Sequence, residues 1–190
     1  MLEMEEIILA SQSPRRSEIL KLMQIPFTAI PAKNECGVDP SLPIRKAVMA
    51  VARKKAEEVA KLHPGRIVLG ADTVVSIDGE ILGKPLDKQH AFEMLRKLSG
   101  NTHTVYTGVW VCGKKFSGGF TDSAKVKFYP LSDREILDYI ATLEPMDKAG
   151  AYGIQGYGMR LIKSITGDFY TVMGLPGGRL LRFLSKIAKS

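Results

Sequence analysis

Two adjacent arginines, Arg15 and Arg16, stand where the sequence predicts the start of a helix. Residues 13–16 read Ser-Pro-Arg-Arg, an order that favours a serine N-cap followed by proline at the first helical position. The first turn of a helix carries a partial positive charge, so two guanidinium groups there repel one another unless an anion lies between them. With a strand expected over residues 7–10 and the Ser11 hydroxyl in the intervening turn, this helix start is a candidate phosphate-binding site. The alternative is a helix whose arginines simply point into water.

Asp72 is the acidic residue whose position is most informative. It follows the apolar segment 66–71, which is typical of a buried strand, and we expect it to end that strand. Open α/β sheets bind ligands at the carboxyl ends of their strands. An ionised carboxylate there needs a cation or hydrogen-bond donors, and the alternative is a turn aspartate satisfied by nearby backbone N–H groups. Glu35, in a polar loop expected over residues 32–43, offers a second carboxylate or is simply solvated.

A lysine and a glycine-rich segment complete the candidates. Lys84 lies between Gly83 and Pro85 at a rigid corner, where it provides a cation or is an ordinary surface lysine. Residues 147–156 contain several glycines, which permit close approach of the backbone to a ligand. Gln155, within that segment, can both donate and accept hydrogen bonds at the edge of a nucleotide base.

These residue types together indicate phosphoryl chemistry on a nucleotide, with Mg²⁺ or Mn²⁺ held by oxygen ligands and an activated water. No serine or cysteine nucleophile comes with an evident paired base. Cys36 and Cys112 are far apart and the three histidines are isolated from one another, which disfavours a disulfide, a zinc site or a histidine metal centre. The sequence contains no Gly-x-x-x-x-Gly-Lys-Ser/Thr loop, so a P-loop enzyme is excluded.

The elements that must position these residues alternate between helices and strands. A polar segment over residues 166–168 is expected to join 159–165 and 169–173 in a last hairpin. Because several strands arrive as hairpins, we expect a mixed sheet rather than a purely parallel one. Helices are expected over residues 14–24, 43–63, 87–99, 132–143 and 177–188, and strands over 7–10, 26–30, 66–71, 74–82 (a hairpin), 103–112 and 116–129.

The whole chain bounds the class of protein. Its 190 residues suffice for a single domain over 1–190 with two lobes about a central sheet, and 45% hydrophobic residues are typical of a globular protein. No apolar run reaches the roughly 20 residues of a membrane span. The acidic first six residues do not resemble a signal peptide, so we expect a cytoplasmic protein. A net charge of +7 predicts an anionic partner without distinguishing nucleotide, nucleic acid or counterions.

Six segments, taken in order, resemble the Maf family and span nearly the whole chain. They are residues 10–16 (Ala-Ser-Gln-Ser-Pro-Arg-Arg), 70–75 (Gly-Ala-Asp-Thr-Val-Val), 83–85 (Gly-Lys-Pro), 98–105, 144–156 and 172–176 (Val-Met-Gly-Leu-Pro). The resemblance implies a nucleoside triphosphate pyrophosphatase that cleaves the α–β phosphoanhydride, releasing a monophosphate and pyrophosphate. It also implies an α/β fold similar to inosine-triphosphate pyrophosphatases: an elongated mixed β-sheet flanked by helices, in two lobes with the site in a central cleft.

The same resemblance implies roles for particular residues. Asp72 matches the proton acceptor of the family, and with Glu35 it would hold the divalent cation. The positions that set substrate specificity are matched by Arg15, Thr73 and Gln155. The polar residues that line the triphosphate and metal site are matched by Ser11, Arg16, Glu35, Lys55 and Lys84.

The exact residues in two of these segments resemble those of one branch of the family. Ser-Pro-Arg-Arg and Gly-Ile-Gln-Gly resemble the branch acting on dTTP and UTP, whereas the branch acting on 7-methyl-GTP usually carries different residues there. Thr171 stands where asparagine is frequent, and Cys36 where a second acidic residue is common; these departures bear on metal affinity more than on reaction type.

Two other functions stay open at this point. One is a pyrophosphatase for 7-methyl-GTP or other non-standard nucleotides. The other is a non-enzymatic nucleotide- or nucleic-acid-binding regulator of septum formation, although the sequence lacks a DNA-binding motif and aromatic residues interleaved with the basic ones. The resemblance also makes a homodimer plausible, but no exposed apolar stripe identifies an interface, and no membrane partner is expected.

Overall fold

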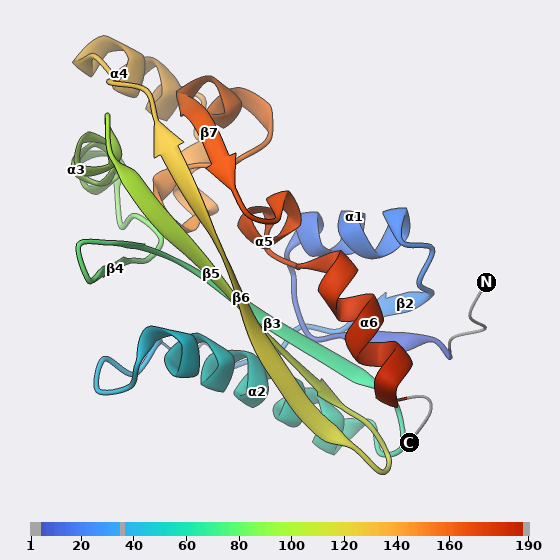
Figure 1. The fold of residues 1–190 in the computed structure, drawn as a ribbon. Coiled ribbons are helices and arrows are strands. Elements are labelled where there is room, and N and C mark those ends of the chain that lie inside the picture. The colour runs from blue at the N-terminus through green and yellow to red at the C-terminus, as the bar shows by residue number, and fades with distance from the viewer. Residues whose placement is uncertain (1–4, 35–36, 188–190) are drawn as a thin grey trace. The chain divides into compact units, whose positions relative to one another are not determined.

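The structure is a computed structural model that describes residues 5–34 and 37–187 (Figure 1). The strands are β1 (Ile7–Leu9), β2 (Phe27–Ala29), β3 (Val68–Ile77), β4 (Glu80–Leu82), β5 (Thr102–Cys112), β6 (Ser117–Phe128) and β7 (Ile162–Thr166). The α-helices are α1 (Pro14–Leu22), α2 (Ile44–Leu62), α3 (Lys88–Leu98), α4 (Asp133–Ala141), α5 (Phe169–Met173) and α6 (Gly177–Ile187). Short 3₁₀ helices are η1 (Glu144–Asp147), η2 (Ala149–Ala151) and η3 (Gly156–Leu161).

The strands form a mixed seven-stranded sheet, as expected. Its order is β2-β1-β3-β5-β6-β7, and β4 pairs with β3. Strand β1 is parallel to both β2 and β3, whereas β4 is antiparallel to β3 and β7 is antiparallel to β6. The β3–β4 hairpin turns at Asp78 and Gly79, whose positive φ angles of 51° and 81° match the tight turn that an Asp-Gly pair predicts. The predicted α/β class with a mixed sheet flanked by helices is therefore confirmed.

The chain divides into two compact units. The first contains residues 1–72, 107–122 and 174–190, and the second contains 73–106 and 123–173. Each unit has its own apolar core: Ile8, Val59 and Val68 belong to the first, while Leu95 and Phe128 belong to the second. Two units agree with the two predicted lobes. The single domain over 1–190 and the cleft between the lobes stay predictions.

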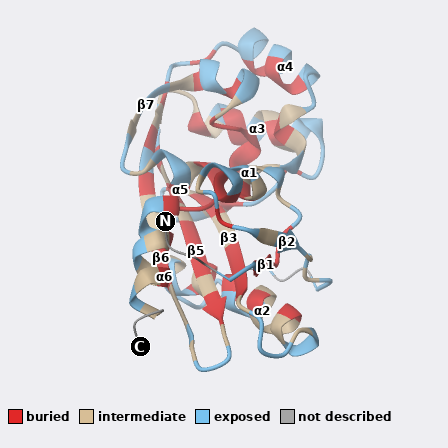
Figure 2. Ribbon diagram, turned by 90° about the vertical axis from the view of Figure 1, so that its right-hand side faces the viewer, coloured by how far each residue is buried: buried red, intermediate tan, exposed pale blue. Residues whose placement is uncertain are grey.

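Two glycines bring α2 directly onto the sheet in the first unit. A Cβ atom at Gly70 of β3 would lie 2.3 Å from the Ala52 carbonyl oxygen, and one at Gly108 of β5 would lie 2.7 Å from the Met49 nitrogen. Neither distance is possible for a real side chain, so these strand glycines mark a close approach of helix and sheet backbone. Figure 2 shows much of β3 and β5 in the red of buried residues. This packing fixes the position of Lys55 on α2.

Asp72 does not end a strand, which corrects the prediction. Strand β3 runs without interruption from Val68 to Ile77, and Asp72 and Thr73 are its two partly exposed central residues. The β-branched residues Val74 and Val75 continue the strand, and pairing with β4 extends it to Ile77. The expectation that ligands bind at the carboxyl end of a strand therefore does not apply to Asp72. Its charge still requires a cation or hydrogen-bond donors nearby.

The last predicted hairpin is also wrong in part. Strand β7 pairs with β6, and Phe169–Met173 is the helix α5 rather than a returning strand. Asp168 explains the difference: its Oδ1 accepts a hydrogen bond from the Tyr170 backbone N–H at 3.2 Å, and its Oδ2 accepts one from the Thr171 hydroxyl, also at 3.2 Å. Local capping by an aspartate thus overrides the strand preference of the aromatic residues that follow.

The other predicted elements lie where they were expected, within a few residues at their ends. Asp87 accepts a hydrogen bond from the His90 N–H at the start of α3, and Ser132 and Glu135 form the predicted capping box of α4. Among the described residues, none of the helices is long and apolar enough to span a membrane.

Candidate active site

The start of α1 holds a buried arginine. Ser13 and Pro14 occupy the predicted N-cap and first helical positions, but it is the Ser11 hydroxyl that accepts a hydrogen bond from the Ser13 N–H, at 3.2 Å. The Arg16 side chain turns back toward this segment: Nη1 donates to the Ser11 hydroxyl and Nε donates to the Gly174 carbonyl oxygen, both at 2.9 Å. Arg16 is only 9% exposed. The alternative in which it simply points into water is therefore excluded.

The charges of this region act on one another. Burial lowers the pKa of the Arg16 guanidinium, the negative charge of Asp72 raises it, and the positive charge of Arg15 lowers it. An arginine nevertheless remains a cation at neutral pH. Arg16 thus lies within electrostatic reach of both Arg15 and Asp72, although residues 16 and 72 are far apart in sequence.

Asp72 is paired with a lysine from α2. The Lys55 Nζ donates to Asp72 Oδ1 at 2.6 Å, and the two side chains are 22% and 18% exposed. Lys55 reaches this position because Ala52 and Ala56, on the same side of α2, pack against Gly70 two residues before Asp72. A cation, rather than the backbone N–H groups of a turn, therefore compensates this carboxylate.

In the second unit, the loop of Lys84 is joined to the glycine-rich segment. The Gly83 carbonyl oxygen accepts a hydrogen bond from the Gly150 N–H at 2.9 Å. Gly150 has φ of +67°, and a Cβ atom there would lie 2.9 Å from Val75 Cγ2, so a glycine is required both for its backbone conformation and for its packing on β3. Lys84 itself is exposed, and Gln155 is partly buried at the N-cap of η3.

The predicted site residues divide between the two units. Ser11, Arg15, Arg16, Lys55 and Asp72 belong to the first unit. Thr73, Lys84 and Gln155 belong to the second. Glu35, the second predicted metal ligand, lies outside the described residues.

Some residues that organise the site were not singled out by sequence reasoning. The carbonyl of Gly174 orients Arg16, and Gly70 and Gly108 allow α2 to bring Lys55 to Asp72. Glycines within predicted strands were a usable signal for the close packing, because a glycine there weakens the strand unless a neighbour needs the space. No local pattern identifies a carbonyl acceptor that lies 158 residues away from its donor.

The residues present fit a divalent cation whose ligands come partly from the protein and partly from the substrate. Within residues 5–34 and 37–187, no group of three or more His, Cys, Asp or Glu side chains is arranged to hold a metal ion. Magnesium sites commonly use one or two carboxylates and complete their shell with water and substrate phosphate oxygens. The Asp72 carboxylate, next to cations suited to a polyphosphate, matches that kind of site better than a metal cage formed by protein alone.

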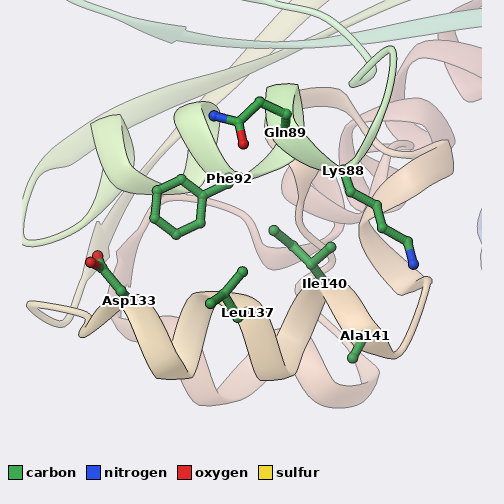
Figure 3. Close-up of a pocket in the computed structure, with 7 residues that line it drawn as sticks. All are labelled: Lys88, Gln89, Phe92, Asp133, Leu137, Ile140 and Ala141. Atoms are coloured by element: carbon green, nitrogen blue, oxygen red, sulfur yellow. The ribbon is translucent and has the colours of Figure 1, made fainter.

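A groove in the second unit lies between α3 and α4 (Figure 3). Its volume is about 420 Å³, and the side chains of Phe92, Leu137 and Ile140 point into it. None of the predicted site residues that the structure describes lines this groove. Its surface is mainly apolar, and although Lys88 and Asp133 line it, it brings none of the predicted site residues together, so we place the candidate active site at Asp72 instead.

Comparison with known proteins gives the class to which this arrangement belongs. Residues 6–187 match the family of Maf-like proteins, and the chain belongs to this family. It is 48% identical to a dTTP/UTP pyrophosphatase of Bacillus velezensis over 182 residues, covering 96% of each chain. It is also 48% identical to a dTTP/UTP pyrophosphatase of Bacillus cytotoxicus over 183 residues, again covering 96% of each chain. Among solved structures, it is similar to a dITP/XTP pyrophosphatase of Mycobacterium abscessus, with 11% identity, 97% of each chain covered and a TM-score of 0.49.

Proposed function

We propose that this protein is a nucleoside triphosphate pyrophosphatase that acts on dTTP and UTP. The reaction consumes one water, breaks the α–β phosphoanhydride and releases a nucleoside monophosphate and pyrophosphate. The observation that carries the proposal is Asp72, a carboxylate in the middle of β3 that is paired with Lys55 and lies within electrostatic reach of Arg16. The relatives that are 48% identical over almost their whole length, both dTTP/UTP pyrophosphatases, support the reaction and the substrate class.

Asp72 is proposed as the general base. Its carboxylate accepts a proton from the water that attacks the α-phosphorus, while the bridging oxygen leaves with the pyrophosphate. An acceptor for this step has to be fixed in direction, and the 2.6 Å hydrogen bond from Lys55 favours this.

The cationic side chains are proposed to bind the triphosphate. Charge on the leaving pyrophosphate grows in the transition state, so positioned cations accelerate the reaction. Arg15, Lys55 and Lys84 supply such charges. Arg16 is held by Ser11 and Gly174, and we assign it, with the Ser11 hydroxyl, to shaping the phosphate-binding turn and to adding its fixed charge there.

Asp72, together with Glu35, would hold a Mg²⁺ or Mn²⁺ ion that arrives with the triphosphate. When bound, such an ion neutralises phosphate charge and makes a coordinated water more acidic.

Recognition of the base is proposed for Gln155, with Arg15 and Thr73 contributing to specificity. An amide that offers both a donor and an acceptor suits the edge of a pyrimidine. A cytoplasmic location and a homodimer are retained as proposals.

The test is a panel of nucleotides assayed for pyrophosphate with the purified full chain and Mg²⁺ or Mn²⁺. We expect dTTP and UTP to be the best substrates, with 7-methyl-GTP and ITP clearly slower. Fast hydrolysis of 7-methyl-GTP or ITP instead would favour the pyrophosphatase for non-standard nucleotides. Absence of pyrophosphate from every triphosphate would overturn the proposal and favour a non-enzymatic regulator.

A further inference from the structure

The carboxylate of Glu144, at the start of η1, accepts hydrogen bonds from a loop that follows it in sequence. Its Oε2 accepts from the Tyr157 backbone N–H at 2.8 Å. Its Oε1 accepts from the Gly158 N–H at 3.0 Å and from the Tyr139 hydroxyl at 2.8 Å. These three donors are all uncharged, and together they satisfy both oxygens of a partly buried carboxylate.

Tyr139 extends this contact to the other end of the same loop. Its hydroxyl oxygen, which donates to Glu144, also accepts a hydrogen bond from the Gly153 N–H at 3.0 Å. Glu144 therefore holds residue 158 directly and residue 153 through one phenol. The segment 153–158 is anchored at both ends, and Gln155 lies within it.

The glycines of this segment allow its backbone to lie close to the Glu144 carboxylate. A Cβ atom at Gly156 would lie 2.5 Å from Glu144 Oε2, and Gly156 also has a positive φ of +65°. A Cβ atom at Gly153 would lie 3.2 Å from Glu144 Oε1, and one at Gly158 would lie 2.1 Å from the Gly153 carbonyl oxygen. The loop thus closes tightly on Glu144, with no room for a side chain at Gly156 or Gly158. Gln155 is the amide side chain that the closed loop carries.

We propose that Glu144 is a positioning residue for substrate recognition: its carboxylate fixes the backbone of residues 153–158 and so orients the Gln155 amide toward the nucleotide base. This inference rests on the proposed function, because it assumes that Gln155 reads the base. Glu144 acts through the loop and does not itself contact the reacting atoms, so its loss affects discrimination among nucleotides more than the chemical step.

The test replaces Glu144→Gln in the full chain. The amide nitrogen is a donor, so at least one of the three donors now facing the carboxylate loses its acceptor. We expect KM for dTTP and UTP to rise about tenfold while kcat changes by less than about threefold, the pattern of lost binding rather than lost chemistry. The preference for dTTP over dATP, as a ratio of kcat/KM values, should fall by a similar factor.

Glu135→Gln is the matched control. Glu135 is a neighbouring glutamate in α4 that also accepts a backbone hydrogen bond, from Ser132 at 2.8 Å, but its carboxylate caps the start of its own helix. Its substitution should lower thermal stability slightly and leave KM and nucleotide preference unchanged. The double variant Glu144→Gln with Gln155→Ala should discriminate no worse than Gln155→Ala alone, since the side chain that Glu144 orients is already gone.

The outcomes separate this inference from the proposed function. If the wild-type chain releases pyrophosphate from dTTP but Glu144→Gln keeps its KM and preference, the positioning role is overturned and the pyrophosphatase stands. A uniform fall in kcat with unchanged preference also overturns it, because that result indicates a structural role alone. If no triphosphate is hydrolysed by the wild-type chain, both proposals fail together. Should Glu144→Gln not fold, Tyr139→Phe serves the same test, with about a threefold loss of preference expected from removing the link to Gly153.

Discussion

Asp72 and Glu144 are two partly exposed carboxylates that the structure compensates in different ways. Cations act on Asp72: Lys55 is hydrogen-bonded to it, and the charge of Arg16 is felt across the same region. Neutral donors satisfy Glu144, namely two backbone N–H groups and one tyrosine hydroxyl. A carboxylate paired with a lysine side chain can exchange that partner when a charged ligand binds, whereas a carboxylate bonded to backbone N–H groups holds the backbone in place. The first arrangement suits a residue that takes part in the reaction, and the second suits a residue that positions a loop.

The contrast extends to the interior of each unit. Among the described residues, the first unit buries the charged residue Arg16, while the second unit buries the neutral pair His103 and Tyr152, whose Nε2 and hydroxyl oxygen lie 2.7 Å apart. Burial lowers the pKa of His103 to about 4 and raises the pKa of the Tyr152 hydroxyl, so both groups are uncharged near neutral pH. Four experiments can break or sharpen this comparison.

The largest effect is expected from Asp72→Asn. Asparagine keeps the shape of the side chain and an oxygen that accepts from Lys55, but it cannot take a proton from water. We expect turnover of dTTP to fall by about 10²–10⁴-fold, the usual contribution of a general base, with little change in thermal unfolding. Steady-state pyrophosphate release and calorimetry measure the two quantities. Hydrolysis of dTTP at a near-normal rate would refute the assignment of the base.

A pH titration of stability tests the neutral interior of the second unit. The unfolded chain protonates His103 near pH 6.5, whereas the folded chain does so only near pH 4. The unfolded state therefore binds the extra proton between these values, and the His103 contribution is complete above pH 6.5 and lost progressively as pH falls to 4. The full loss is about 3 kcal/mol in the free energy of unfolding.

Urea denaturation at several pH values between 4 and 7.5 measures this dependence. In His103→Phe the slope should become shallower over that window, although the variant is less stable at pH 7.5 because Tyr152 loses its partner. The same slope in both proteins would show that other groups cause the pH dependence.

Gly70→Ala tests whether close packing of α2 is what delivers Lys55 to Asp72. The added methyl group cannot fit 2.3 Å from the Ala52 carbonyl oxygen, so α2 must shift. We expect a loss of about 1–3 kcal/mol in the free energy of unfolding together with lower activity. Gly178→Ala in α6 is the control, since nothing lies within 4 Å of the added atom there, and it should be neutral or slightly stabilising.

Lys55→Met should lower the turnover of dTTP less than Asp72→Asn does. It removes the hydrogen bond to Asp72 but keeps the apolar length of the side chain on α2. We expect kcat/KM for dTTP to fall about tenfold, with the fold retained, because the charge of Arg16 still acts on the carboxylate and Arg15 is still available for the phosphates. A loss as large as that of Asp72→Asn would mean that Lys55 takes part in the chemistry itself.

Much of this molecule follows from short stretches of sequence. The helix starts at Ser13-Pro14, Asp87 and Ser132, and the turn at Asp78-Gly79, depend on residues within three or four positions of one another, and each is found where the sequence predicts it. Most candidate site residues, though not Glu35 or Lys55, likewise lie in local segments that resemble those of one family. These features depend on interactions between residues close in sequence, so they can be predicted from the sequence.

Only the tertiary structure decided how those pieces serve the site. Asp72 lies inside β3 because pairing with β4 at Val75–Ile77 extends that strand past the predicted end, and its partner Lys55 comes from a helix held close by Gly70. Phe169–Met173 became a helix because Asp168 caps it, although the residue types favour a strand. Arg16 finds its carbonyl 158 residues away. Such contacts depend on packing between distant segments, whose free energy no short window of sequence contains.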